Sequence, residues 1–430
     1  MNKISSRIPN FYNLSIEQRI NKISEIFSLN QNEIDLLKNN SIDLDIADKM
    51  IENAIGTFSL PIGLGLNFLI NGKDYIVPMV VEEPSVIAAA SSAAKIIRQA
   101  GGFKATSTES MMIGQIQVVN CDFEKAKKII IEQKDVLINI ANNSEPKMKE
   151  RGGGAKDLEV RILGNENEYP YCKMLVIHLL IDTCDAMGAN LINTMCEAVS
   201  PYIEEITGGK VYLRILSNFT DKRLAKAEVK IPYELFDNKN YKGKDVVEGI
   251  IQAQNFAYLD TYRATTHNKG ILNGIDPVVI ATGNDWRAIE AGIHAYACKN
   301  GHYRSLTKWY KDNQDNLIGE LELPMAVGIV GGATKIHPLA QLCLKILGVK
   351  SARELAEVIV CVGLAQNLSA IKSLATEGIQ KGHMALHARN VAASAGAKGD
   401  LVNIIAKELV KLNEIKIDKA KSLLKEYSIK

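Results

Sequence analysis

Two adjacent carboxylates, Glu82 and Glu83, follow an apolar segment over residues 75–81 and precede Pro84. The junction of a strand with a helix is a common place for active-site groups, and a carboxyl group whose pKa is raised by burial or by nearby carboxylates can act as a general acid. Acidic side chains also stabilise a helix N-terminus, so a capped helix that Pro84 opens is the simpler interpretation. The sequence alone does not choose between Glu82 and Glu83, which point to opposite sides of an extended segment.

A lysine and an aspartate stand in polar motifs further along the chain. Lys269, in Thr-Thr-His-Asn-Lys-Gly, is flanked by small or polar residues rather than by an amphipathic face. We expect it to reach into a site where its ammonium group stabilises an oxyanion; an exposed surface lysine is the alternative. Asp285, in Gly-Asn-Asp-Trp, is interpreted either as turn chemistry or as a carboxylate between Glu83 and Lys269 that keeps the lysine charged.

Histidines and cysteines give no sign of a metal centre. His383 and His387 have i, i+4 spacing within Gly-His-Met-Ala-Leu-His, but neither a third ligand nor an H-E-x-x-H glutamate accompanies them. The seven cysteines include no C-x-x-C pair. We therefore expect no bound metal, and reduced thiols in a cytoplasmic protein.

The run Asp185-Ala-Met-Gly-Ala-Asn190 joins an apolar strand to a helix and contains a single glycine, so it is not a Rossmann fingerprint. Such a junction can still present backbone N–H groups to a pyrophosphate. A second glycine-rich loop covers residues 328–335, and we interpret the glycines at 152–154 as a flexible connection.

Together these motifs, in this order, resemble 3-hydroxy-3-methylglutaryl-coenzyme A (HMG-CoA) reductase, and most closely its shorter, soluble class II. The resemblance extends from Ser6 to about Glu426. It implies an NAD(P)-dependent oxidoreductase that interconverts (S)-HMG-CoA and (R)-mevalonate plus coenzyme A. The reaction would proceed by two hydride transfers through mevaldyl-CoA and mevaldehyde, in mevalonate synthesis or degradation.

The resemblance also assigns catalytic roles. It places the catalytic carboxylate on Glu83, the oxyanion-stabilising cation on Lys269 and the modulating carboxylate on Asp285, and it makes His383 the proton donor to the departing CoA thiolate. It implies a homodimer with each active site at the interface, with Glu83 and Lys269 from different subunits, and it allows a hexamer.

Binding residues follow in the same way. The implied cofactor contacts are Glu145, Asp185, Met187, Gly188, Asn190 and Asn193, and the implied substrate contacts are Ser85, Arg263, Thr266, Asn273 and Gln366. Tyr12 stands where relatives often carry an arginine for the CoA phosphates. A carboxylate at Glu145 would repel a 2′-phosphate and favours NADH over NADPH, whereas Lys147, Lys149 and Arg151 could do the opposite.

The elements that must position these residues predict an α+β fold. Hydrophobic spacing predicts helices within residues 15–55 and over 88–100. Residues 110–219 then predict a βαββαβ series typical of a ferredoxin-like domain, with strands at 111–120, 158–163, 173–182 and 211–217 and helices at 123–142 and 191–206. We predict a large domain in two parts, 1–109 and 220–375, a small NAD(P)-binding domain at 110–219 and a helical C-terminal flap at 376–430 with hinges at Gly378 and Gly382.

Bulk composition sets limits on other functions. With 51 basic and 49 acidic residues the net charge is +2, which gives no electrostatic basis for binding nucleic acid or an acidic membrane surface. We find no apolar run of the roughly 18 residues that spans a bilayer. Two alternatives remain: a CoA-thioester transferase or lyase that uses no nicotinamide, and a non-catalytic ferredoxin-like binding protein.

Overall fold

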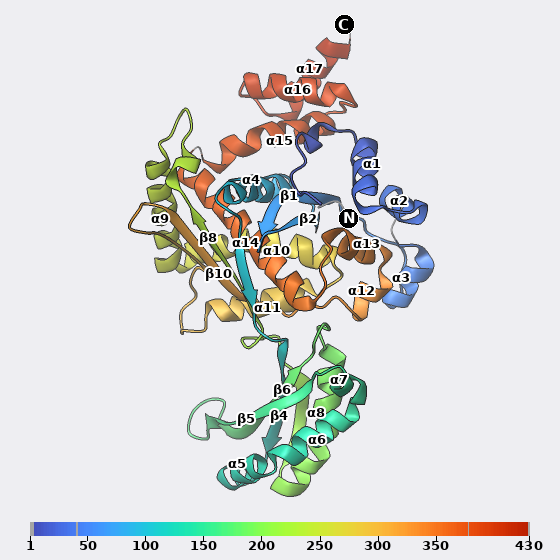
Figure 1. Cartoon of the computed structure of the whole chain (residues 1–430), viewed down its shortest axis with the longest axis vertical. Coiled ribbons are helices and arrows are strands. Elements are labelled where there is room, and N and C mark those ends of the chain that lie inside the picture. The colour runs from blue at the N-terminus through green and yellow to red at the C-terminus, as the bar shows by residue number, and fades with distance from the viewer. Residues whose placement is uncertain (1–3, 40–41, 377, 429–430) are drawn as a thin grey trace.

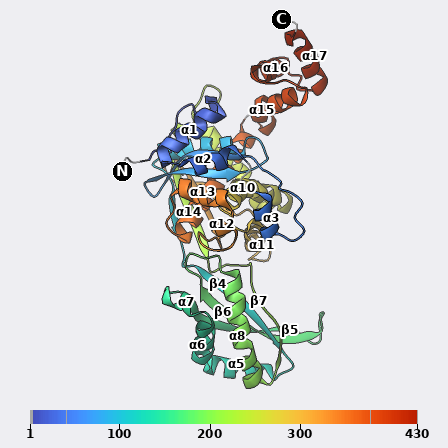
Figure 2. The same cartoon turned by 90° about the vertical axis from the view of Figure 1, so that its right-hand side faces the viewer.

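The computed structural model describes residues 4–39, 42–376 and 378–428, without the side chains of residues 379–386. Helices and antiparallel sheets occur together, and this confirms the predicted α+β class. In both Figure 1 and Figure 2, a small unit of sheet and helix lies at one end of the molecule, and the last three helices lie at the opposite end. The large central body lies between them.

The N-terminal segment is helical, as predicted, but broken. A 3-10 turn (Phe11–Asn13) precedes α1 (Ile16–Phe27), α2 (Gln31–Lys38) and α3 (Leu44–Met50). A new helix begins after Asn30 and another after Asp43, because the side chains of these two residues accept hydrogen bonds from backbone N–H groups of the helix that follows. Ser6, before these helices, is fully buried and its hydroxyl group bonds the Asp74 carboxylate, so the chain is fixed to the central body at this residue.

Two sheets support the central body. Strands β1 (Ile62–Ile70) and β2 (Lys73–Val80) form an antiparallel hairpin. A second antiparallel sheet has the strand order β3-β8-β10-β9, from β3 (Lys104–Ser107), β8 (Leu224–Ile231), β10 (Leu317–Pro324) and β9 (Thr307–Lys311). Of these, only β2 was anticipated from the sequence.

Helices cover these sheets. They are α4 (Val86–Gln99), α9 (Gly243–Leu259), α10 (Thr261–Ala281), α11 (Trp286–Ala297), α12 (Gly332–Ile336), α13 (Pro338–Leu347) and α14 (Ala352–Ala375), with a 3-10 turn at Tyr233–Phe236. By length and composition α14 would pass as a membrane span, but 67% of its apolar window is buried inside the protein. It packs against α10, α4, α9 and β8, so its apolar surface forms the core of the central body.

The small unit has the predicted βαββαβ order. Its elements are β4 (Met111–Val119), α5 (Phe123–Glu132), α6 (Lys134–Ser144), α7 (Pro146–Glu150), β5 (Gly154–Asn165), β6 (Cys172–Asp182), α8 (Ala189–Thr207) and β7 (Lys210–Leu216). All strand pairs are antiparallel in the order β5-β6-β4-β7, as a split βαβ fold requires. The single helix expected over 123–142 is interrupted at Gln133, which ends α5 and precedes α6.

The chain ends in α15 (Ile379–Ser394), α16 (Asp400–Lys411) and α17 (Ile417–Ser428), which share a hydrophobic cluster of their own. Gly378, with φ of 80°, lies directly before α15. These features fit the expected helical flap, while the exact domain boundaries at 110, 219 and 376 stay predictions.

Packing inside the small unit makes one glycine indispensable. A Cβ atom at Gly114 on β4 would lie 2.3 Å from the Cys196 sulfur and 2.9 Å from Ile192 on α8. We expect Gly114→Ala to lower the free energy of unfolding by about 1–3 kcal/mol through overpacking. Chemical denaturation measures this loss.

A double-mutant cycle provides the control. Cys196→Ala removes the sulfur atom that the new methyl group would meet, so the double variant should recover part of the loss. Strictly additive losses would mean that the predicted clash is absent.

Candidate active site

Glu83 lies on the bend between β2 and α4, as the sequence suggested, but it does not cap a helix. Helix α4 begins at Val86, and its N-cap residue is Ser85, with φ of 75° and no side-chain capping bond. Pro84 therefore precedes the cap rather than opening the helix, and the capped-helix interpretation is wrong. Glu83 is left with a carboxylate free to face another element.

That element is α10. The Lys269 Nζ atom lies 3.1 Å from Glu83 Oε2, and the two side chains are 61% and 41% exposed. An ion pair so open to solvent contributes little stability, so its residues are available for chemistry. Both belong to the same chain, and this corrects the expectation that they come from different subunits.

Lys269 belongs to a polar stripe on α10. Thr266, Lys269, Asn273 and Asp276 follow the 3-4-3 spacing that places residues on one helical face. Thr266 and Lys269 are exposed, and Asn273 and Asp276 are partly buried, so the stripe runs from solvent into the protein. Two residues implied for the substrate thus share a helical face with Lys269. Arg263, also on α10, is partly buried.

Asp276, at the buried end of this stripe, lies in an unusual environment. We did not single out this residue from the sequence. Burial, together with the charge and hydrogen bond of the neighbouring Glu290 on α11, raises the pKa of Asp276 to about 8, while the Lys269 charge opposes the rise. The Asp276 Oδ1 atom is buried without a hydrogen-bond partner. Its spacing of seven residues from Lys269 was the available signal.

The residues before Lys269 are structural. His267 is buried, and its Nε2 atom lies 2.6 Å from the Thr307 hydroxyl oxygen and 3.1 Å from Asn367 Nδ2. Burial lowers the pKa of His267 to about 3, so it is neutral. Asn268 is also fully buried and bonds backbone groups of Arg304 and Leu306. These contacts fix the inner face of α10 and leave Lys269 on the outer face.

Asp285 performs the turn chemistry that was the simpler interpretation. It is the N-cap of α11, accepts backbone hydrogen bonds from Arg287 and Ala288, and pairs with the Arg287 guanidinium at 3.2 Å. In the described part of the chain, no hydrogen bond or ion pair joins it to Lys269 or Glu83. Lys269 also lies twelve residues before the end of α10, roughly 18 Å along the helix axis. Within one chain Asp285 therefore does not lie between Glu83 and Lys269, and its catalytic role stays a prediction.

The turn over residues 183–188, here called the cofactor turn, leads from β6 into α8. Gly188 is the N-cap of α8 with φ of 94°, and a Cβ atom there would lie 2.4 Å from Thr183, so only glycine fits. No side chain caps α8, and its first backbone N–H groups remain available for an anionic ligand. Met187 is partly buried and Asn190 exposed near the same helix end.

Two of the implied cofactor contacts have structural partners instead. The Asp185 carboxylate accepts a hydrogen bond of 2.8 Å from the Ala352 N–H group at the start of α14. The Asn193 side chain accepts one from the Leu216 N–H group on β7. A direct cofactor contact by these two side chains stays a prediction.

The cofactor turn meets the second glycine-rich loop and, through it, the motif of Asp285. Ala186 pairs with Val330, and a Cβ atom at Gly328 would lie 2.6 Å from the Met187 backbone nitrogen. The Asn284 side chain bonds both backbone groups of Gly328, at 2.8 and 3.1 Å. Three motifs far apart in the sequence thus contact one another, and the described residues show no polar contact between them and Glu83 or Lys269.

The other implied contacts are scattered. Ser85 is partly buried beside Glu83; Gln366, on α14, is buried, and its Oε1 atom has no hydrogen-bond partner. Tyr12 is 77% exposed, and Glu145 is partly buried between α6 and α7. His383 lies on α15, but its side chain is outside the described residues. His387, on the same helix, is exposed.

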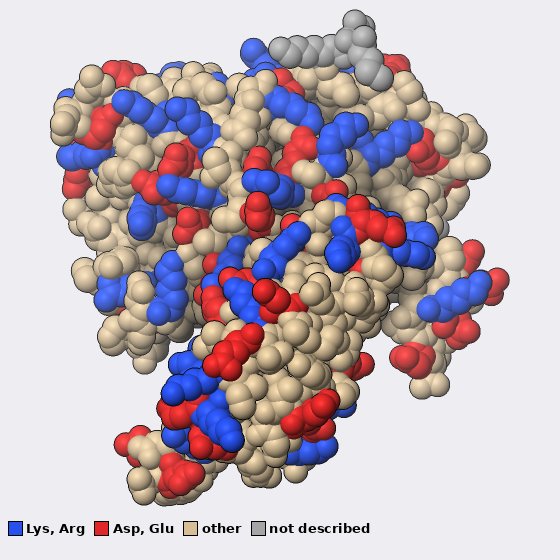
Figure 3. All heavy atoms as spheres, turned by 60° about the horizontal axis from the view of Figure 1, so that its bottom comes forward, with Lys and Arg blue, Asp and Glu red and all other residues tan. Residues whose placement is uncertain are grey.

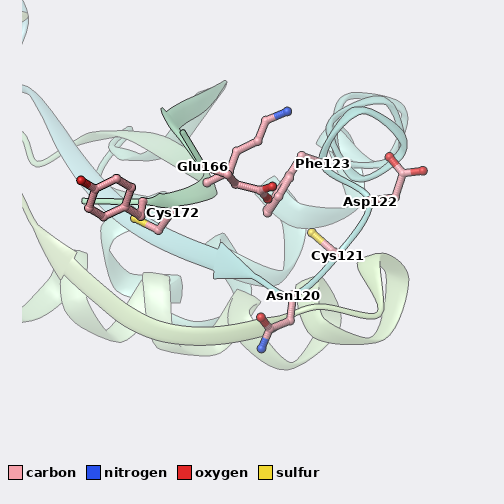
Figure 4. Close-up of a pocket in the computed structure, with 8 residues that line it drawn as sticks. Asn120, Cys121, Asp122, Phe123, Glu166 and Cys172 are labelled. Atoms are coloured by element: carbon pink, nitrogen blue, oxygen red, sulfur yellow. The ribbon is translucent and has the colours of Figure 1, made fainter. Parts of the chain in front are cut away.

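In the part of the chain that the structure describes, neither two further surface features nor the placement of metal-ligating side chains points to a second site. The hollow in Figure 4 lies at the end of β4 in the small unit and is lined by residues such as Asn120, Cys121 and Glu166, none of them in the motifs above. The face seen in Figure 3 intersperses basic and acidic side chains rather than gathering one sign. Among the described residues, no three His, Cys, Asp or Glu side chains gather as metal ligands.

Comparison with known proteins identifies the architecture. The family model of hydroxymethylglutaryl-coenzyme A reductase matches residues 15–388. A 3-hydroxy-3-methylglutaryl-coenzyme A reductase from Archaeoglobus fulgidus is 52% identical over 98% of this chain and 94% of its own length. A probable reductase of the same name from Borreliella burgdorferi is 36% identical, over 89% of this chain and 86% of its own.

Solved structures agree with these sequence matches. A 3-hydroxy-3-methylglutaryl-CoA reductase from Streptococcus pneumoniae superposes with a TM-score of 0.83 at 40% identity, covering 97% of this chain and 99% of that chain. A class II reductase from the same organism, bound to NADPH in open conformations, gives a TM-score of 0.82 at 42% identity over 86% of this chain and 99% of that chain.

The raised pKa of Asp276 predicts how stability depends on pH. Between its ordinary value of 3.8 and about 8, the folded protein holds a proton that the unfolded chain releases, so the free energy of unfolding falls as pH rises through this range. Asp276→Asn removes that loss, and its gain in Tm over the natural chain should be larger at pH 8 than at pH 5.

Thermal unfolding across pH tests this, with Glu290→Gln as a second arm. Removing the Glu290 charge lowers the pKa of Asp276 and should narrow the pH range of the effect. Parallel Tm profiles for Asp276→Asn and the natural chain would contradict the assignment.

Proposed function

Because the chain belongs to the hydroxymethylglutaryl-coenzyme A reductase family, as a class II member and an NAD(P)-dependent oxidoreductase, we propose that it interconverts (S)-HMG-CoA and (R)-mevalonate plus coenzyme A through two hydride transfers. The observation that carries this proposal is the exposed ion pair of Glu83 and Lys269, at the end of a polar stripe on α10. The pair unites an acid and a cation, which reduction of a thioester requires.

Each residue of the pair has a separate task. The Lys269 ammonium group binds the thioester oxygen and stabilises the negative charge that grows there during reduction. Glu83, whose side chain Lys269 contacts at 3.1 Å, takes up a proton from solvent and in this protonated form donates it to the alkoxide, which completes the alcohol of mevalonate. His383, on α15, protonates the departing CoA thiolate. A thioester transferase or lyase would have no use for the cofactor turn.

The residues that we propose for substrate binding lie on the polar stripe of α10 and on neighbouring elements. Thr266 and Asn273 lie on the same face of α10 as Lys269, and Arg263 is available to bind the terminal carboxylate of the acyl group in bidentate fashion. Ser85 lies two residues after Glu83. Gln366, on α14, has a buried side-chain oxygen, Oε1, that lacks a hydrogen-bond partner. We propose that these residues hold the acyl group. For the CoA phosphates, this chain has Tyr12 where relatives often carry an arginine.

The N-terminus of α8 fits the cofactor. Its uncapped N–H groups and the positive end of its dipole suit a pyrophosphate, and Gly188 leaves room for close approach. The nicotinamide supplies the hydride when bound. The Streptococcus pneumoniae relative was solved with NADPH. For this chain we propose NADH, because Glu145 would repel a 2′-phosphate.

We propose that a second copy completes each site. Asp285 and the cofactor turn form one group, Glu83 and Lys269 form another, and the described residues show no polar contact between the two groups. Large apolar side chains that a dimer could cover are exposed in two segments of the central body: Ile55 at 102% and Phe58 at 91%, and Leu259 and Tyr262 at 82% and 89% just before Arg263. In this arrangement, Asp285 of one copy approaches Lys269 of the other.

Absorbance at 340 nm with purified protein and HMG-CoA tests the reaction, with NADH and NADPH in parallel. We expect two nicotinamides to be oxidised for each CoA released. Lys269→Ala should lose about 3–4 kcal/mol of transition-state stabilisation. Lys311→Ala, at another exposed lysine paired with a carboxylate, is the matched control and should retain activity. CoA release without nicotinamide oxidation would instead indicate a thioester transferase or lyase.

Mixed dimers test the division of the site. Lys269→Ala and Asp285→Ala chains should each be inactive alone, whereas the purified heterodimer should recover about half of the natural activity, because one of its two sites is intact. A heterodimer of Lys269→Ala with Glu83→Gln is the control and should stay inactive, because both changes fall in the same group. An inactive first heterodimer would show that Lys269 and Asp285 act from one chain.

A further inference from the structure

Arg223 is a buried charge that none of the roles above uses. It lies immediately before β8, where the chain returns from the small unit to the central body, and it is 4% exposed. Its Nη1 atom donates hydrogen bonds to the Thr183 hydroxyl oxygen at 3.0 Å and to the Ala186 carbonyl oxygen at 3.1 Å. Its Nη2 atom donates to the Val327 carbonyl oxygen.

These acceptors belong to two segments that must stay together. Thr183 and Ala186 lie in the cofactor turn, and Val327 directly precedes Gly328 in the glycine-rich loop. The Ile329 N–H group also donates to the Asp185 carbonyl oxygen at 2.9 Å. The guanidinium group therefore joins the small unit to the central body beside the start of α8.

The charge of Arg223 strengthens this link. Burial lowers the pKa of Arg223 to about 10, which still leaves it protonated at neutral pH, and the charges of Asp182 and Asp185 oppose the fall. Its hydrogen-bond acceptors are neutral oxygen atoms, and hydrogen bonds from an ionised donor are stronger than neutral ones. Without the guanidinium, the buried carbonyl oxygen of Val327 and the partly buried one of Ala186 would each lose a partner.

Asp185 fixes the same turn from the other side. Its carboxylate accepts the first N–H group of α14, which is otherwise an orphan donor at the positive end of a long buried helix. Because α14 packs against α10, the cofactor turn is linked to the helix that carries Lys269.

We propose that Arg223 is a positioning residue for the nicotinamide cofactor, which holds the cofactor turn against the glycine-rich loop so that the N-terminus of α8 faces the substrate side of the site. This inference rests on the proposed function, because it takes α8 as the cofactor's binding element. Arg223 itself need not touch the cofactor.

Arg223→Lys tests the proposal, because lysine keeps the charge but cannot reproduce the planar fork that reaches both segments. We expect the Kd of the full-length protein for NADH or NADPH, measured by nicotinamide fluorescence, to rise on the order of tenfold. The KM for the cofactor should rise with it, and kcat at saturating cofactor should change less. Hydrogen exchange at the Ile329 amide should accelerate.

Arg98→Lys is the matched control. Arg98 is a partly buried arginine that pairs with Asp74 and bonds Ser6, and neither of these partners belongs to the cofactor turn or the glycine-rich loop. It should lose stability while the cofactor Kd and the exchange at Ile329 stay unchanged. A general effect of losing a buried guanidinium would instead move the Kd in both variants, and this would overturn the proposal.

The outcomes separate the two proposals. Natural protein that binds neither NADH nor NADPH would overturn the proposed function and this inference with it. Natural protein that binds, together with an Arg223→Lys variant of unchanged Kd, would overturn this inference alone. If Arg223→Lys fails to fold, Thr183→Val, which removes one acceptor of the guanidinium, carries the test with the same expected direction.

Discussion

The close crossing of α10 and α14 is the constraint on which the rest of the structure depends. A Cβ atom at Gly274 on α10 would lie 2.7 Å from Gln366 on α14, and one at Gly363 on α14 would lie 2.9 Å from Ile275. Glycines on both helices thus allow the backbones to approach, and the apolar surface of α14 is buried as a result. Helix α10 carries Lys269, and the first residue of α14 donates a backbone hydrogen bond to Asp185 of the cofactor turn.

The packing of the central body explains why each polar motif contains residues besides the one proposed for catalysis. In the motif of Lys269, His267 and Asn268 hold the inner face of α10 against β9 and its preceding loop, and only the lysine turns outward. In the motif of Asp285, Asn284 holds the glycine-rich loop. A motif residue can therefore matter because it places a neighbour, without meeting a ligand itself.

The two groups of the candidate site are positioned by different means. Glu83 and Lys269 face each other from a bend and a helix of the central body, in an ion pair too exposed to hold that body together. The cofactor turn, by contrast, is anchored by a buried hydrogen bond from Arg223 and a partly buried one to Asp185. In the proposed function, cofactor placement would therefore depend on the junction with the small unit, whereas Glu83 and Lys269 would depend on the helix pair. Helix α15, which carries His383, lies at the end of the molecule opposite the small unit (Figure 1, Figure 2).

The sequence by itself determined the family, the α+β class, the βαββαβ order of the small unit and the place of Glu83 between a strand and a helix, because motif order and local periodicity are properties of neighbouring residues. It missed β1 and also β3, β8, β9 and β10, whose pairings include contacts between distant segments. Only the tertiary structure decided that Glu83 meets Lys269 within one chain, that Asp285 caps α11 instead, and that Asp276 is buried beside Glu290. Side-chain meetings of this kind depend on how helices pack across the fold, which spacing along the chain does not specify.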